Sequence, residues 1–130
     1  VLSVYDENTW RPYCHVKDFA KLIDLVINVP KDQINFEIFN AGGNENHATK
    51  KQIVEKIKKY LPKINVQYSK HGSDPRNYKV NFNKVRNKLN FLPSYSIQDG
   101  IEEIIKYLDE NNLDKVKKNR NYYGNYLLKK

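Results

Sequence analysis

The chain has 130 residues, of which 39% are hydrophobic and 29% charged, and its formal net charge is +8 at pH 7. This composition excludes an intrinsically disordered chain, and the length suits one compact domain with a single modest core. No apolar run is long enough to cross a bilayer, and a single cysteine cannot form an intramolecular disulfide, so we expect a cytoplasmic protein without membrane contact.

The first part of the chain predicts two strands followed by a helix. Residues 1–5 alternate between apolar and polar side chains, and residues 11–16 form a second strand pattern with Pro12 at its entrance. Asp18 is the expected N-cap of a helix that ends at Pro30. The apolar residues of this helix recur at helical spacing and are Phe19, Leu22, Ile23, Val26 and Ile27.

The middle of the chain predicts a buried strand, a turn and a helix. Residues 36–41 form a short apolar run that is typical of a buried strand, and the GGN sequence after it favours a tight turn over a phosphate-binding loop. Thr49 and Gln52 have the spacing of a capping box, which predicts that a helix begins there. The expected buried stripe of this helix is Ile53, Val54, Ile57 and Leu61.

The last part predicts a strand over 64–68, a turn-rich loop over 71–78 and a short extended piece over 79–82. Asn81 is the expected cap of a brief helix, and Ser96 with Asp99 marks the start of a final one. The inward residues of these two helices are Val85, Leu89, Ile97, Ile101, Ile104, Ile105 and Leu108. Short strands interleaved with three to four helices predict an α/β fold with some parallel pairing.

The residues that look most reactive predict no catalytic site. Cys14 and His15 are adjacent in a predicted strand, so their side chains point to opposite faces and cannot form a nucleophile–base pair. Cys14 is expected to be a small buried hydrophobe, and His15 to pack or hydrogen-bond within the domain. The three histidines are scattered, without the spacing of metal ligands, so we expect no metal site.

Two arginines have the properties of anion-binding residues. Arg11 lies beside Pro12 at the start of a predicted strand, and Arg76 lies in the SDPRNY loop, where Asp74 and Pro75 restrict the backbone. Each guanidinium is a planar fork that matches phosphate oxygens. On the residues alone, a diphosphate clamp and surface ion pairs both remain open.

The positive charge is concentrated at one end. Residues 112–130 carry six basic side chains and one acid in a Tyr-rich tail, which we expect to dock on the body. A basic end is more often a solvated surface than a nucleic-acid reader. The alternative that this leaves open is a basic α/β module that contacts nucleic acid through its Lys- and Tyr-rich tail.

Four segments, taken in order, resemble one known family: VLSVYDENTWRPYCHVKDFAKLI, FNAGGNENHATKKQIVEKI, DPRNYKVNFNKVRNKLNF and SIQDGIEEIIKYL. Together they are similar to the C-terminal, substrate-binding portion of extended short-chain dehydrogenase/reductases, in particular the NAD-dependent nucleoside-diphosphate-sugar epimerases and dehydratases. The resemblance runs over residues 1–111, which we take as the substrate-binding domain, and leaves 112–130 as a tail. Since the chain begins with Val1 and contains no Met, we expect it to be a piece of a longer polypeptide.

The resemblance implies a role for each matching residue. Val4 and Tyr5 would lie near the nucleotide base, Arg11 would contact the diphosphate, and Arg76 would close over the phosphates or ribose from the other side. The ligand would be a nucleoside-diphosphate sugar. A regulatory or structural remnant without ligand binding is a third interpretation.

The resemblance also implies what this chain lacks. The family's glycine-rich dinucleotide loop and its Tyr-x-x-x-Lys catalytic pair belong to an N-terminal Rossmann portion, so the chain alone is expected to hold no cofactor and to be catalytically inactive. The intact protein would use NAD(P), bound mainly by that missing portion, and would be a homodimer. Asp6 stands where family members commonly have Gly, and Asn90 where Gly often ends a helix.

Overall fold

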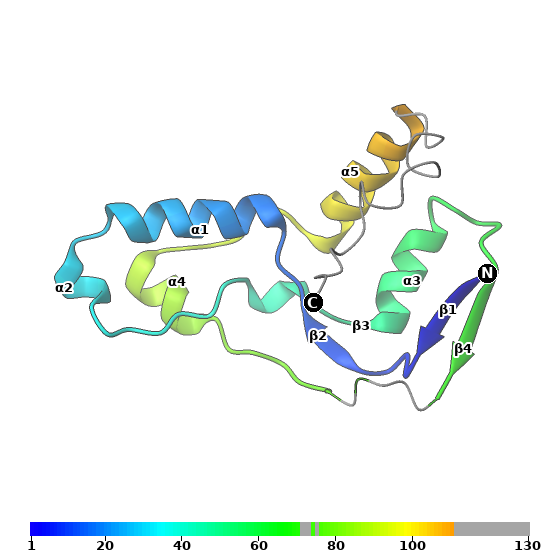
Figure 1. Ribbon diagram of the computed structural model, residues 1–130, viewed down its shortest axis with the longest axis horizontal. Coiled ribbons are helices and arrows are strands. Elements are labelled where there is room, and N and C mark those ends of the chain that lie inside the picture. The colour runs from blue at the N-terminus through cyan, green and yellow to red at the C-terminus, as the bar shows by residue number, and fades with distance from the viewer. Residues whose placement is uncertain (71–73, 75, 111–130) are drawn as a thin grey trace, which may run out of the picture.

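The computed structural model describes residues 1–70, 74 and 76–110 and gives an elongated α/β arrangement (Figure 1). The helices are α1 (Val16–Asn28), α2 (Lys31–Ile34), α3 (Lys50–Lys58), α4 (Asn83–Leu89) and α5 (Ile97–Glu110), with a 3₁₀ turn, η1 (Asn44–Asn46). The strands are β1 (Leu2–Tyr5), β2 (Trp10–Pro12), β3 (His47–Thr49) and β4 (Val66–Ser69). This confirms the predicted α/β class.

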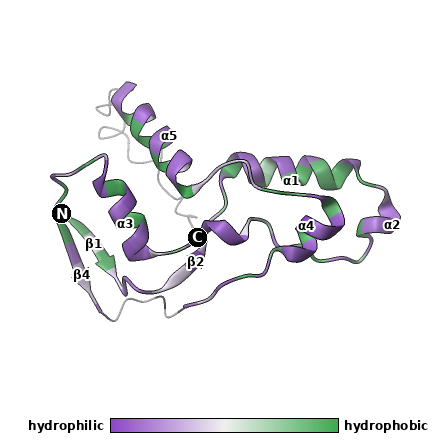
Figure 2. Cartoon of the chain, turned by 180° about the vertical axis from the view of Figure 1, so that it is seen from behind, coloured by the Kyte–Doolittle hydropathy of each residue, from purple (hydrophilic) through white to green (hydrophobic). Residues whose placement is uncertain are grey.

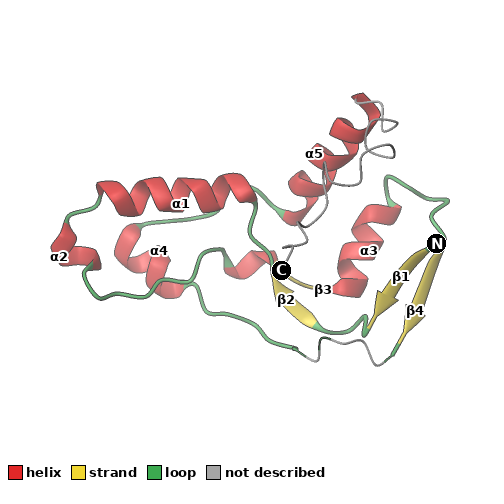
Figure 3. Cartoon of the chain, viewed as in Figure 1, coloured by secondary structure: helices red, strands yellow, loops and turns green. Residues whose placement is uncertain are grey.

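The strands form two small sheets. β1 pairs with β4 in parallel, with Val4 opposite Tyr68, and β2 pairs with β3 in antiparallel register, with Arg11 opposite Ala48. The parallel pair confirms the expected parallel pairing. Figure 3 shows both sheets toward one end of the molecule, with α1, α2 and α4 at the other end.

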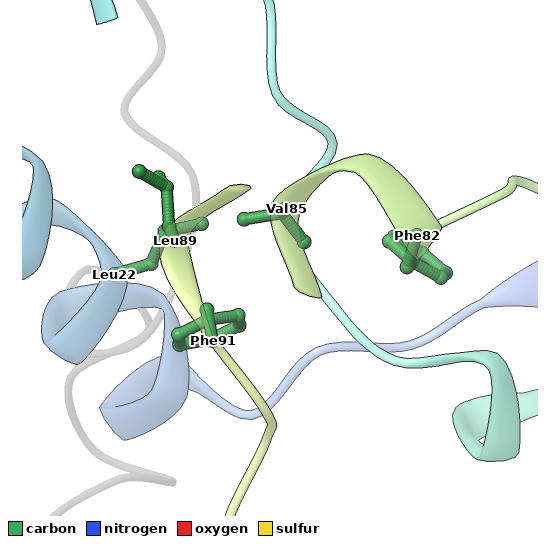
Figure 4. Packing of buried hydrophobic residues seen from close by; sticks show 5 residues of the cluster. All are labelled: Leu22, Phe82, Val85, Leu89 and Phe91. Atoms are coloured by element: carbon green, nitrogen blue, oxygen red, sulfur yellow. The ribbon is translucent and has the colours of Figure 1, made fainter. Parts of the chain in front are cut away.

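A small hydrophobic core holds α1 and α4 together. Phe91 and Val85 are 2% and 1% exposed, and with Leu22, Phe82 and Leu89 they form one buried cluster (Figure 4). The prediction that Val85 and Leu89 point inward is therefore confirmed. This core also fixes the segment directly before α4, because Val80 packs against the cluster and Phe82 belongs to it.

The first helix begins earlier than its sequence pattern suggested. The N-cap is His15, whose Nδ1 accepts a hydrogen bond from the Lys17 backbone N–H. The prediction that Asp18 is the N-cap is wrong, because its carboxylate instead accepts hydrogen bonds from the N–H groups of Ser94 (2.7 Å) and Tyr95 (3.0 Å). The predicted strand over 11–16 is too long, since β2 ends at Pro12 and α1 already begins at Val16.

The predicted buried strand over 36–41 is also wrong within the residues that the structure describes. Phe36 has a φ of 58° and is 98% exposed, and Ile38 is 82% exposed. Only the end of this run is drawn inward, where Phe39 and Ala41 pack against the core cluster. A short apolar run does not by itself determine which of its residues find partners. The unpredicted β3 follows instead, at residues 47–49.

Several predicted helix ends are confirmed, but the N-cap of α4 is Phe82 and not Asn81, whose Oδ1 accepts from the Asn83 N–H (2.8 Å). Thr49 and Gln52 form both hydrogen bonds of a capping box at the start of α3, and Ser96 and Asp99 bond reciprocally at the start of α5. Asn90 adopts the left-handed conformation that ends α4, with a φ of 49°. Asp6, at a position where the family commonly has Gly, is also left-handed, with a φ of 51°. Asn and Asp both tolerate this conformation.

The stripe of α5 is less buried than expected. Within the described part of the chain Ile97, Ile101 and Ile105 are only partly covered, while Ile104 is 61% and Leu108 41% exposed. Figure 2 shows hydrophobic positions alternating with hydrophilic ones along α5. No helix in residues 1–70 or 76–110 combines the length and apolar character needed to span a membrane. The predicted docking of the tail over 112–130 lies outside the described residues.

Candidate functional site

Arg11 is held in place on β2 by its own backbone surroundings. Its Nη1 donates to the carbonyl oxygens of Trp10 (2.8 Å) and Arg76, and its guanidinium lies over the ring of Tyr78 at 5.4 Å from the centroid. The side chain is only 14% exposed. Arg11 is therefore a fixed positive charge rather than a freely rotating surface side chain.

The segment after Arg76 is attached along the antiparallel β2–β3 pair. The Trp10 N–H donates to Asn77 Oδ1 (2.8 Å), and the Tyr78 N–H donates to the Trp10 carbonyl (3.4 Å). Further along, the Val80 N–H donates to His47 Nε2 (2.9 Å). These bonds join residues far apart in the sequence and bring the loop of Arg76 against Arg11.

His47 contributes to this attachment in one tautomer. Its Nε2 accepts from Val80, so its Nδ1 carries the proton and donates to the Asn44 carbonyl at 2.9 Å. The imidazole thereby links η1 to the segment over 76–80. His47 is a structural residue of the site: in the described part of the chain its hydrogen bonds join Asn44 and Val80, and neither arginine.

The two arginines converge on one carboxylate, that of Asp74. Arg76 binds it in a bidentate manner, with Nε 2.7 Å from Oδ1 and Nη2 2.9 Å from Oδ2. Arg11 Nη2 lies 3.1 Å from the same Oδ2. The structure therefore brings together the two guanidinium groups that the sequence singled out, around an anionic group.

The charges of this group reinforce one another. Hydrogen bonds from the Arg76 side chain and backbone N–H, and then the nearby Arg11 guanidinium, hold the pKa of Asp74 well below its ordinary value. The same bonds to Asp74 raise the pKa of Arg76. With two guanidinium groups and one carboxylate, the set carries a formal net charge of +1.

The two arginines differ in their freedom. The Arg76 side chain is 69% exposed, whereas that of Arg11 is 14% exposed. A ligand can therefore reach Arg76 from solvent, while Arg11 forms the inner wall of the site. This difference suits a fixed anchor and a second group that closes over what the anchor holds.

Val4 and Tyr5 lie in the other sheet. Val4 is 8% exposed within β1, and Tyr5 at the end of β1 is 50% exposed, with its carbonyl accepting from Lys50 Nζ (2.7 Å). Of these two, only Tyr5 presents a side chain to solvent. The structure thus pairs Arg11 with Arg76, and within the described residues no side-chain hydrogen bond or ion pair joins either arginine to the β1–β4 sheet.

Cys14 and His15 have structural surroundings. His15 stacks on Tyr95 with 4.4 Å between ring centroids, and its Nε2 lies 3.3 Å from Glu103. The expectation that His15 packs and hydrogen-bonds within the domain is confirmed. Burial, and then the nearby Asp18, raises the pKa of the half-buried Cys14 thiol, which disfavours the reactive thiolate.

The opposite face of the β2–β3 pair holds a surface hollow of about 600 Å³, lined by Trp10, Asn44, His47, Lys79, Val80 and Asn81. Adjacent residues of a strand point to opposite faces, so Trp10 faces the hollow and Arg11 faces away from it. Lys79 Nζ covers the Trp10 ring at 3.7 Å. Its lining contains no arginine, so the hollow lacks a converging pair of guanidinium groups.

Sequence reasoning missed two contributors. Asp74 was expected only to shape its loop, although its spacing two residues before Arg76 is typical of a local ion pair. Tyr78, under Arg11, gave no signal of its own, because a cation–π contact between distant residues depends on how the loop is attached. Among the described residues no three His, Cys, Asp or Glu side chains gather as metal ligands.

The GGN segment does not fit a dinucleotide phosphate. Gly42 has a φ of 141°, and a Cβ at this position would lie 2.9 Å from the Phe82 ring. The glycine is thus required by packing and backbone conformation. The segment leads into η1 and β3, and the first three N–H groups of α3 already donate to Thr9 O, Glu7 O and Thr49 Oγ1.

Comparisons with known proteins agree on the fold. No family model matches the chain. Among solved structures it is similar to dTDP-glucose 4,6-dehydratase from Bacillus anthracis in complex with NAD, at 29% identity and a TM-score of 0.66, covering 84% of this chain and 34% of that one.

Two L-threonine dehydrogenases match in fold alone. The enzyme from Phytophthora infestans is 17% identical with a TM-score of 0.71 over 83% of this chain, and that from Clostridium difficile is 21% identical with a TM-score of 0.70 over 85%. The chain spans about a third of these proteins, 34% to 37% of their length. These matches confirm the resemblance drawn from the sequence: the chain is similar in fold to about a third of a dehydratase solved with NAD and of two dehydrogenases.

Proposed function

We propose that the chain is the substrate-holding part of an NAD(P)-dependent sugar-nucleotide epimerase or dehydratase, in which Arg11 and Arg76 bind the diphosphate of a nucleoside-diphosphate sugar. The observation that carries this proposal is the convergence of both guanidinium groups on one carboxylate, with Nη2 atoms 3.1 Å and 2.9 Å from Asp74 Oδ2. A carboxylate and a phosphate each present two oxygens that can accept two parallel hydrogen bonds from one arginine.

The proposed chemistry assigns binding to this chain and the reaction to the rest of the protein. NAD(P), held by a Rossmann portion outside these residues, would supply hydride transfer. Arg11 and Arg76 would fix the diphosphate so that the sugar projects toward that portion, which lowers the entropic cost of the reaction. Tyr5 is the exposed residue that we propose near the base, with Val4 supporting it from within β1. The whole protein would act as a homodimer.

The binding proposal is tested by titrating the chain with dTDP-glucose and UDP-glucose and following amide chemical shifts. We expect saturable binding that Arg11→Ala weakens on the order of tenfold or more, since a charge-assisted hydrogen bond contributes about 1.5–3 kcal/mol. Arg11→Lys keeps the charge but loses the fork, so it should restore the affinity only in part.

Arg86→Ala is the matched control, because Arg86 is an exposed arginine in the last turn of α4. It should bind the nucleotide sugars like the unmodified chain. Equal losses of nucleotide-sugar affinity in Arg11→Ala and Arg86→Ala would contradict a specific binding site at Arg11. Binding to an oligonucleotide that falls steeply with salt, without any binding of nucleotide sugars, would favour the basic-module alternative.

A further inference from the structure

We propose that Asp74 is an internal competitor for the ligand's phosphates, and that it sets how much negative charge a ligand needs in order to occupy the site of Arg11 and Arg76. The inference rests on the proposed function of that site and deepens it. It assigns to Asp74 a role in selecting the ligand, which the arginines alone do not explain.

The position of the carboxylate supports competition. Asp74 Oδ2 is shared by Arg76 Nη2 (2.9 Å) and Arg11 Nη2 (3.1 Å), while Oδ1 accepts from the Arg76 backbone N–H (3.2 Å) and Nε (2.7 Å). A residue that served only to orient Arg76 would need the Arg76 contacts alone. Because Oδ2 also reaches Arg11, the carboxylate occupies the place between the guanidinium groups where a phosphate oxygen would bind.

The bond to Arg11 is incomplete, which leaves room for a better ligand. Arg11 Nη2 is shielded from solvent and lies within ion-pair distance of Asp74, yet it has no hydrogen-bond partner with acceptable geometry in the described part of the chain. A shielded donor without a partner is costly. A phosphate oxygen aligned with Nη2 would satisfy it, whereas the aspartate, tied to its own loop, does not.

The charge balance explains the selection. With Asp74 in place the three side chains carry a net charge of +1, and without it the two arginines carry +2. A ligand with a single negative charge gains little by replacing a carboxylate of equal charge. A diphosphate carries at least two negative charges and more oxygens, so it can replace Asp74 and still gain charge-assisted hydrogen bonds.

The test compares Asp74→Asn with Asp32→Asn in the whole 130-residue chain at fixed ionic strength. Both changes remove one negative charge, and Asp32 is an exposed residue of α2, at the far end of the molecule from β2 (Figure 1). Inorganic pyrophosphate and inorganic phosphate are the probes, and their dissociation constants are measured by calorimetry or chemical-shift titration.

We expect Asp74→Asn to bind pyrophosphate about five- to tenfold more tightly and to gain a larger factor for phosphate, so that the preference for pyrophosphate over phosphate narrows. Asp32→Asn should change either constant less than about twofold, as expected of a distant surface charge. If the thermal midpoint shows that Asp74→Asn does not fold, Asp74→Ser provides the same removal of charge.

Unchanged or weaker pyrophosphate binding in Asp74→Asn would overturn the inference. If Arg11→Ala lowers nucleotide-sugar affinity in the same experiment, the proposed function stands and only the role of Asp74 fails. If pyrophosphate binds to no variant and Arg11→Ala has no effect on nucleotide sugars, both proposals fail. A gain in Asp74→Asn that disappears in Arg11→Ala/Asp74→Asn supports both.

Discussion

Asp18→Ala is expected to destabilise the chain by about 3 kcal/mol, because it removes a buried charged acceptor from two backbone donors. Asp18 is fully buried, and its two carboxylate oxygens accept hydrogen bonds from the backbone N–H groups of Ser94 (2.7 Å) and Tyr95 (3.0 Å). This loss is a large fraction of the 5–15 kcal/mol that typically separates a folded domain from its unfolded state. Urea unfolding followed by circular dichroism measures it.

The matched control is Asp24→Ala, which removes an exposed aspartate from the same helix, α1. It should cost less than about 1 kcal/mol, as most surface substitutions do. Asp18→Asn keeps one acceptor and should fall between the two. Equal midpoints for Asp18→Ala and Asp24→Ala would show that the segment over 94–95 does not depend on this carboxylate.

Phe91→Ala is expected to cost about 3–5 kcal/mol, the usual range for removing a buried phenyl ring from a well-packed core. Phe91 is 2% exposed and belongs to the cluster that joins α1 to α4. Its neighbour in the sequence, Leu92, is 46% exposed, so Leu92→Ala is the comparison. Thermal and urea unfolding should show a clearly lower stability for Phe91→Ala than for Leu92→Ala. Similar losses of stability in the two variants would contradict a core centred on Phe91.

Local signals explain which parts of the fold could be predicted. The capping box of Thr49 and Gln52 and the left-handed end of α4 at Asn90 depend on neighbouring residues alone, and the structure confirms both. The start of α1 could not be predicted in the same way. Asp18 is a good N-cap by type, but its use by Ser94 and Tyr95, 76 and 77 residues away, is a tertiary contact.

Strands were harder to predict than helices. The apolar run over 36–41 suggested a buried strand, yet Phe36 and Ile38 are almost fully exposed in the structure. Conversely, β3 is only three residues long and exists because it pairs with β2, with Ala48 opposite Arg11. Pairing partners of this kind are set by the whole fold, since strand propensity reflects context more than local sequence.

The candidate site was predicted in part. The residue types and the family resemblance predicted that Arg11 and Arg76 would act together, and the structure brings them to the same carboxylate. Neither pattern identified Asp74 as that shared partner. The solved structures that resemble the chain include a dehydratase and dehydrogenases, so the shared fold supports several reactions, and specificity is expected from side chains such as these.

A double-mutant cycle on Arg11 and Arg76 tests most directly whether both guanidinium groups bind the same diphosphate. Arg11→Ala, Arg76→Ala and the doubly substituted chain are titrated with dTDP-glucose, alongside the unmodified chain. If both guanidinium groups hold one diphosphate, the combined loss of affinity should differ from the product of the single losses by about threefold or more, as for residues that share a partner. Losses that multiply within experimental error, or an Arg76→Ala chain that binds as tightly as the unmodified one, would contradict a common site.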